Sequence, residues 1–159
     1  RKACTADMET FFLGLGSNLG NRVAHLAQGR ELLAASPGIE IERVSPFFLT
    51  DPVGAPGPRY LNCVARGSTS LLPGELLLRL QEIEQRALRV RTGPGSPRTL
   101  DLDLLFYADR QISEAELVVP HPRLHQRRFV LEPLCWIAPE LIHPVLRRTV
   151  AELLAGLPA

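Results

Sequence analysis

The order of strand-like and helix-like segments in residues 11–107 is the feature that most limits the folds open to this chain. Short apolar runs bounded by glycine and proline predict strands, and apolar residues spaced three and four apart predict helices. In chain order the predicted elements are strand 11–16, helix 22–35, strand 39–47, strand 60–69, helix 73–88 and strand 99–107. This βαββαβ order predicts a ferredoxin-like α+β core, with helices packed on a mainly antiparallel sheet. Residues 118–122 and predicted helices at 129–136 and 149–154 form a C-terminal elaboration.

Length and charge favour one soluble domain. The chain has 159 residues and a formal net charge of +1, so no overall field attracts nucleic acid or an anionic membrane. We expect a single domain over residues 10–159, with residues 1–9 a tag, linker or disordered start. No apolar run approaches the roughly 20 residues of a membrane span. Three cysteines far apart in sequence suit a reduced compartment, so we expect a cytoplasmic protein.

The predicted strand 99–107 carries two carboxylates. Its period of two places Asp101 and Asp103 on one face, and the opposite face would carry Leu100, Leu102, Leu104 and Phe106. Two carboxylates at neighbouring positions of one face suit Mg²⁺, which takes oxygen ligands and completes its shell with water and phosphates. An isolated Asp-x-Asp more often simply faces solvent, so the neighbouring charges decide between these interpretations.

Arginines flank the acidic pair in two stretches without acidic residues. Residues 85–100 contain Arg86, Arg89, Arg91 and Arg98, and residues 120–131 contain His121, Arg123, Arg127 and Arg128. One guanidinium group can donate two parallel hydrogen bonds to the oxygens of a phosphate. Because the sole lysine of the chain is Lys2, arginines would have to bind the phosphates. Either cluster alone could be a solvated surface, but both beside Asp-x-Asp favour a polyphosphate ligand.

Three other patterns carry less weight. Gly14-x-Gly16-x-x-x-Gly20 has one residue too many for a dinucleotide fingerprint, and no P-loop sequence occurs. His121 and His125 have metal-ligand spacing, but no cysteine or third histidine nearby completes a zinc site. Trp136 has apolar neighbours at helical spacing, so we expect it in the core.

Five motifs in order resemble one enzyme family of folate synthesis. They are Gly16-Ser17-Asn18-Leu19, Tyr60-Leu61-Asn62, Pro97-Arg98-Thr99-Leu100-Asp101-Leu102-Asp103, Val119-Pro120-His121 and Arg127-x-Phe129. Together they are similar to those of 6-hydroxymethyl-7,8-dihydropterin pyrophosphokinases. The resemblance implies a ferredoxin-like fold and transfer of the β,γ-diphosphate of ATP to the pterin hydroxymethyl group, which releases AMP.

The resemblance also implies residue roles. Asp101 and Asp103 correspond to the ligands of two Mg²⁺ ions, and Arg91 and Arg98 to their catalytic partners. The corresponding ATP-binding residues are Gln81, Glu84, Arg91, Arg98, Leu104, His121 and Arg127. The corresponding pterin-binding residues are Thr50, Val53, Gly54, Tyr60, Asn62 and Phe129, with Tyr60 and Phe129 as the aromatic pair that encloses the ring. ATP and the pterin are the expected partners of a monomer.

The chain departs from the family where relatives commonly have Arg-Trp-Gly-Pro-Arg. This chain has Pro94-Gly95-Ser96-Pro97-Arg98 in a shorter segment. We therefore expect its lid to close less tightly, and the enzyme to turn over more slowly, than in relatives with the full lid. Two other interpretations remain open. A glycosyltransferase also uses Asp-x-Asp, but in a larger chain with a parallel nucleotide domain. A ferredoxin-like regulatory domain could bind a nucleotide without turnover.

Overall fold

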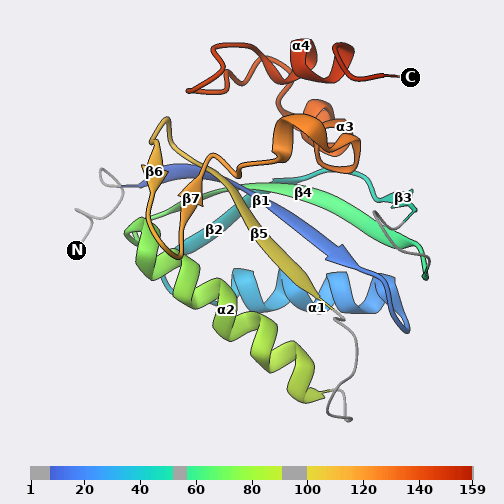
Figure 1. Cartoon of the computed structure of the whole chain (residues 1–159). Coiled ribbons are helices and arrows are strands. Elements are labelled where there is room, and N and C mark those ends of the chain that lie inside the picture. The colour runs from blue at the N-terminus through green and yellow to red at the C-terminus, as the bar shows by residue number, and fades with distance from the viewer. Residues whose placement is uncertain (1–7, 52–56, 91–99, 159) are drawn as a thin grey trace.

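The computed structural model describes residues 8–51, 57–90 and 100–158, with the backbone alone at 88–90. A sheet lies between two helices on one face and one helix on the other, and the C-terminal helix packs on the outside of that one (Figure 1). In spatial order the main strands are β2 (Ile39–Val44), β4 (Tyr60–Thr69), β1 (Glu9–Ser17) and β5 (Asp101–Tyr107). All the neighbouring strands of this sheet pair antiparallel. The predicted ferredoxin-like α+β arrangement is therefore confirmed.

Helices α1 (Arg22–Ala34) and α2 (Pro73–Val90) cover one face of the sheet (Figure 1). The Asn21 side chain caps α1 by accepting a hydrogen bond from the main-chain N–H of Ala24 at 3.1 Å. Helix α2 extends two residues beyond the predicted end. It buries Leu76, Leu80, Ile83 and Ala87, and Leu77 is half-buried. Both helices bury leucines against β1 and β5, so this face forms one apolar core.

The predicted strand 39–47 is interrupted. Strand β2 ends at Val44, and the chain pairs again with β4 as β3 (Phe48–Thr50). At the break the main-chain N–H of Ser45 donates to Val64 O, and the Ser45 hydroxyl accepts from the N–H of Val64 at 3.0 Å. Pro46 follows and has no N–H to donate, so the ladder cannot continue there.

Strand β5 contains a β-bulge that overturns one predicted side-chain orientation. Leu13 of β1 pairs with Leu104 and Phe12 pairs with Phe106, so Leu105 is an extra residue in the strand. Leu104 packs in the core beneath α1 and α2, whereas Leu105 and Phe106 pack in the core on the opposite face. Phe106 therefore shares the face of the two carboxylates, contrary to the period-two prediction.

The C-terminal residues cover the second face of the sheet. Helix α3 (Arg128–Ile137) packs there over Phe12, Val64 and Phe106, and helix α4 (Val150–Ala155) packs on α3 and adds Val150 and Leu153 to the same apolar cluster. Before them come a hairpin of β6 (Ile112–Ser113) and β7 (Val118–Val119) and a 3₁₀ turn, η2 (Leu124–Gln126). No helix in the described part of the chain is long and apolar enough to cross a membrane.

The prediction that Trp136 lies in the core is wrong, because 62% of it is exposed. Helix α3 buries Val130, Leu131, Leu134 and Ile137. Residue 136 is two positions from Leu134, or about 200° around the helix, so it points away from that stripe. Its apolar neighbours in sequence therefore do not share its face.

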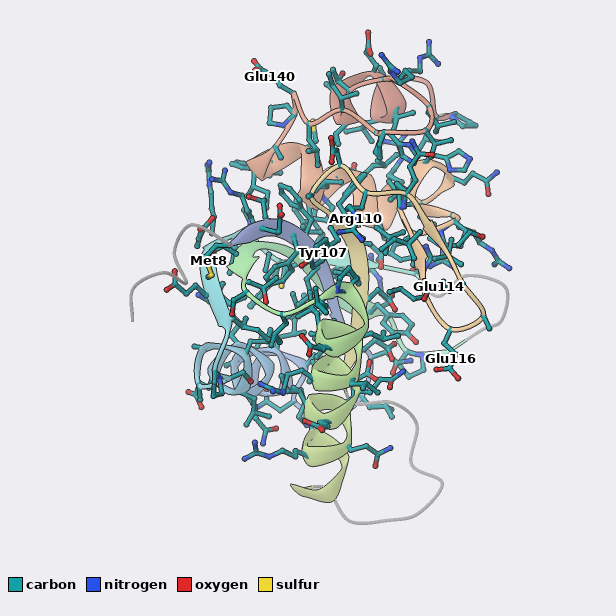
Figure 2. The ribbon with its side chains drawn as sticks, turned by 90° about the vertical axis from the view of Figure 1, so that its left-hand side faces the viewer. Met8, Tyr107, Arg110, Glu114, Glu116 and Glu140 are labelled. Atoms are coloured by element: carbon teal, nitrogen blue, oxygen red, sulfur yellow. The ribbon has the colours of Figure 1, made fainter. Side chains whose placement is uncertain are left out.

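The end of β5 far from the carboxylates is anchored by Tyr107. Its hydroxyl donates to the main-chain oxygen of Leu71, just before α2. The Arg110 guanidinium lies 5.9 Å from the centre of the Tyr107 ring, and Figure 2 shows the two labelled residues close together above the start of α2.

Candidate active site

Three strands place the predicted site residues in two rows across one face of the sheet. Gly16 of β1 pairs with Asp101 of β5 on one side and with Asn62 of β4 on the other. Directly opposed residues of antiparallel strands point to the same face. The carboxylate and the amide therefore share a face, separated by a residue with no side chain.

The second row also has a glycine at its centre. Gly14 of β1 lies between Asp103 of β5 and Val64 of β4. A Cβ atom at Gly14 would have its nearest neighbours at 3.8 Å, in the Leu105 side chain. Gly14 and Gly16 thus leave an open floor between the acidic strand and β4.

A cavity of about 220 Å³ lies above this floor. Seven predicted site residues line it: Thr50, Tyr60, Asn62, Asp101, Asp103, Arg127 and Phe129. The structure therefore brings residues from four separate segments of the chain into one cavity. Leu105 and Val130 supply apolar wall on the side of α3.

The cavity wall on the β4 side is built from a buried amide and a hydroxyl. Asn62 is 8% exposed, and its Nδ2 donates to Thr50 Oγ1 at 2.7 Å. Because the Thr50 oxygen is the acceptor in this bond, its own O–H remains a donor. The pair can offer both a donor and an acceptor to a planar heterocycle.

Two aromatic rings border the same cavity. Tyr60 begins β4 and Phe129 lies in the first turn of α3, and both are half-buried. The Arg127 guanidinium carbon lies 5.4 Å from the centre of the Phe129 ring. Aromatic faces beside a few placed polar groups form a suitable pocket for a flat, polar ring.

The acidic side of the cavity suits a hard cation. Asp101 is half-buried and Asp103 is exposed, whereas Leu102 between them is buried on the opposite face. Among the described residues no three or more His, Cys, Asp and Glu side chains form a metal-binding group. Two carboxylates on an open floor fit Mg²⁺, which uses few protein ligands when phosphates and water complete its shell.

His121 is held beside this acidic side by the bulge in β5. Its main-chain N–H donates to Leu105 O at 3.0 Å. Its Nδ1 accepts from the N–H of Arg123 at 3.3 Å, so the neutral ring carries its proton on Nε2. Burial lowers the pKa of His121, the Asp103 carboxylate opposes that shift, and Arg127 and Arg123 add to it.

Three residues with predicted ATP contacts lie away from the central cavity. Gln81 and Glu84 border a separate cavity along α2, and the Glu84 carboxylate accepts from the N–H of Leu102 at 2.7 Å. The Leu104 side chain is buried beneath the helices, so only its main chain could contact a nucleotide. Arg91, Arg98, Val53, Gly54 and the shortened segment 92–97 lie outside the described residues.

Gly14, Gly16 and Cys63 line the cavity but were not predicted to belong to the site. Gly14 belongs to the glycine pattern that does not fit a dinucleotide site, and Gly16 also begins the motif Gly16-Ser17-Asn18-Leu19, but neither carries a predicted role in the site. Gly14 and Gly16 are two positions apart in a predicted strand, so they lie on the same face of the sheet. This spacing is the sequence feature that could have predicted an open floor. The Cys63 side chain packs in the core beneath α1 and α2, so its main chain borders the cavity. Burial there raises the pKa of the thiol to about 12, and the charge of Arg30 acts in the opposite direction, so the thiol is neutral.

Comparison with known proteins decides which family combines these features. Residues 12–139 match the sequence profile of the family described as "7,8-dihydro-6-hydroxymethylpterin-pyrophosphokinase (HPPK)". The chain belongs to this family. Its antiparallel sheet also argues against the parallel nucleotide domain of a glycosyltransferase.

Relatives at substantial identity carry the same name. A 2-amino-4-hydroxy-6-hydroxymethyldihydropteridine pyrophosphokinase of Synechocystis is 43% identical over 142 residues, which cover 89% of this chain and 73% of the relative. The enzyme of that name from Aquifex aeolicus is 38% identical over 146 residues, covering 91% of this chain and 90% of the relative. The folic acid synthesis protein fol1 of Pneumocystis carinii is also 38% identical, but the match covers 20% of that protein.

Solved structures confirm the HPPK fold. A Plasmodium falciparum HPPK-DHPS triple mutant with SDX-DHP superposes with a TM-score of 0.75 at 15% identity. The match covers 93% of this chain and 44% of that one, so the chain spans less than half of this solved protein. At this identity the likeness concerns the fold alone.

Proposed function

We propose that this protein transfers pyrophosphate from ATP to 6-hydroxymethyl-7,8-dihydropterin, giving AMP and the pterin diphosphate. The observation that carries the proposal is the single cavity in which Asp101 and Asp103 face the Thr50–Asn62 pair, in a member of the HPPK family. In the reaction the pterin alcohol oxygen bonds to the β-phosphorus, the bond from that phosphorus to the α,β-bridging oxygen breaks, and the alcohol proton is released.

The β4 side of the cavity would bind the pterin. Tyr60 and Phe129 would stack on the ring, while Asn62 and Thr50 would read its hydrogen-bonding edge. Val53 and Gly54, which lie outside the described residues, stay as predicted pterin contacts. This arrangement would point the hydroxymethyl group across the glycine floor toward β5.

The β5 side would hold the phosphates. Asp101 and Asp103 would bind two Mg²⁺ ions, which supply charge neutralisation and alignment of the phosphates when bound. Arg127 lines this cavity and His121 lies beside Asp103, so both could donate to phosphate oxygens. Arg91 and Arg98 remain predicted phosphate contacts, and Gln81, Glu84 and the Leu104 main chain remain predicted nucleotide contacts.

Turnover distinguishes this proposal from a regulatory nucleotide-binding domain. Purified protein would be incubated with ATP, Mg²⁺ and the pterin alcohol, and its products would be separated by mass spectrometry. We expect AMP and a pterin with two added phosphates, in amounts that exceed the amount of protein. Binding of ATP with no pterin product would support the regulatory interpretation instead.

We further propose that residues 10–159 act as one domain in a cytoplasmic monomer whose partners are these two small molecules. The near-neutral formal charge of +1 supports this proposal, because it gives no general attraction to nucleic acid. Light scattering during size-exclusion chromatography would test the monomer, and a mass twice that of the chain would contradict it.

A further inference from the structure

The acidic strand β5 lies at an edge of the sheet. β1 pairs with one side of β5, and no strand among the described residues extends the main sheet on its other side. Main-chain N–H groups at a free edge have no strand partner and need another acceptor or water. How this edge is held bears on how accurately Asp101 and Asp103 are placed.

Glu84 provides a partner at the carboxylate end of this edge. Helix α2 runs alongside β5 in both views (Figures 1 and 2). From α2 the Oε2 atom of Glu84 accepts from the N–H of Leu102 at 2.7 Å, and the Glu84 side chain is half-buried. A bond of this length to a carboxylate is among the stronger kinds in proteins.

This bond lies between the two carboxylates in the strand, so it can restrict the backbone that carries them. The N–H of Leu102 belongs to the peptide plane that joins Asp101 to Leu102. Holding that plane limits rotation about the backbone of Asp101, and Asp103 follows one residue later. Leu102 is 6% exposed, so its side chain anchors the same point from the core side.

Two other contacts hold β5, but farther along the strand. The N–H of His121 donates to Leu105 O, and the Tyr107 hydroxyl donates to Leu71 O. Both lie beyond Asp103 in chain order. The bond from Leu102 to Glu84 instead lies between Asp101 and Asp103 in chain order, so it is nearer to both carboxylates than either of these two contacts.

We propose that Glu84 is a positioning residue that fixes the Leu102 peptide and so orients Asp101 and Asp103 for divalent-cation binding. The inference rests on the proposed function, because it assigns the cation to these two carboxylates. Removing a group that orients metal ligands commonly weakens metal affinity or activity by about 10- to 100-fold. A residue that merely contacts ATP would not change the backbone of β5 in the nucleotide-free protein.

The test compares Glu84→Ala and Glu84→Gln with Glu82→Ala. Glu82 lies on the same helix, and its side chain is 69% exposed and paired with Arg79, so it is the matched control. The first readout is hydrogen exchange at the Leu102 amide in the protein without nucleotide. The second is Mn²⁺ affinity, measured by electron paramagnetic resonance with a non-hydrolysable ATP analogue present.

For Glu84→Ala we expect exchange at Leu102 to quicken at least about tenfold and Mn²⁺ to bind about tenfold more weakly. Glu84→Gln should restore most of both properties, because a carboxamide oxygen also accepts a hydrogen bond. Glu82→Ala should change neither. The Gln variant keeps the comparison valid if the Ala variant does not fold.

Two results would overturn the inference. Unchanged exchange at Leu102 in Glu84→Ala would mean that the bond does not hold the strand. Faster exchange with unchanged Mn²⁺ affinity would mean that the bond is structural but does not orient the carboxylates. Failure of the proposed function would look different, because the parental protein itself would then form no pterin diphosphate.

Discussion

Asp101 of β5 and Asn62 of β4 lie opposite the same residue, Gly16 of β1. Neighbouring strands are about 4.8 Å apart, so the two backbones lie roughly 10 Å apart across the floor of the cavity. A heterocycle against Asn62 would thus carry its hydroxymethyl group toward a phosphate held beside Asp101. The register of three strands, rather than any one motif, sets this spacing.

Loss of either acidic residue should abolish most turnover without unfolding the protein. Asp101→Ala and Asp103→Ala each remove one of the two carboxylates that face the cavity, so we expect kcat to fall by about 100-fold or more. Asp109→Ala changes an exposed aspartate beyond the end of β5 and is the control. Near-parental kcat for either cavity variant at saturating Mg²⁺ would remove its proposed ligand role.

The aromatic pair should act on one substrate only. Tyr60→Ala and Phe129→Ala each remove a ring that borders the cavity. Such a contact is worth about 0.5–1.5 kcal/mol beyond the area buried, so pterin affinity should fall several-fold to tenfold while ATP affinity is retained. Calorimetric titration with each substrate measures both effects, and equal losses for the two substrates would indicate damage to the fold instead.

Gly16 should be required for the amide of Asn62 to occupy its position. A Cβ atom at residue 16 would lie 2.9 Å from Asn62 Oδ1, so Gly16→Ala must displace the amide and disturb its bond to Thr50. We expect pterin affinity to fall about tenfold, since a buried polar group loses its partner. Gly14→Ala is the comparison variant, because it also adds a methyl group to the cavity floor but makes contacts no closer than 3.8 Å. If both variants bind pterin equally, the close approach at Gly16 has no functional importance.

Stability should decline in mild acid because of His143. Its ring is 5% exposed, and its Nδ1 accepts from the N–H groups of Val145 and Leu146. Burial, followed by His125, lowers the pKa of His143 below the ordinary value of 6.5. As the pH falls below about 6.5, the unfolded chain takes up a proton that the folded protein resists, so folding becomes less favourable.

We therefore expect Tm to fall between pH 7.5 and pH 5.5, and to fall less steeply in His143→Asn. The asparagine oxygen can still accept at the Nδ1 position, but it does not titrate. Part of the slope should remain, because burial also lowers the pKa of His121. Parallel Tm profiles for the parental protein and His143→Asn would show that another group causes the acid sensitivity.

Much of the architecture was predictable because hydrophobic period and chain breakers decide it. The order of elements and the shared face of Asp101 and Asp103 followed from period two and period 3.6. The bulge at Leu105 was not predictable, because Leu104, Leu105 and Phe106 are all apolar. Without an alternation of apolar and polar residues, the sequence does not show where the side chains change face. Trp136 was misplaced for a related reason, since apolar neighbours in sequence do not establish a shared helix face.

The site was predictable in its residues more than in its geometry. The family resemblance named seven residues that line the cavity. The bond between Glu84 and Leu102 joins residues 18 positions apart and depends on how α2 packs against β5. Gly16 illustrates the same limit. Its role depends on having Asp101 and Asn62 on either side, which is a property of the sheet order.

The central claim is that the cavity supports attack by the pterin alcohol on the β-phosphorus of ATP. The most direct test uses ATP labelled with ¹⁸O at the α,β-bridging position and follows the label by ³¹P NMR and mass spectrometry. Attack at the β-phosphorus predicts labelled AMP and an unlabelled pterin diphosphate. Label in free pyrophosphate with an adenylylated pterin, or label retained in ADP with a singly phosphorylated pterin, would contradict the account.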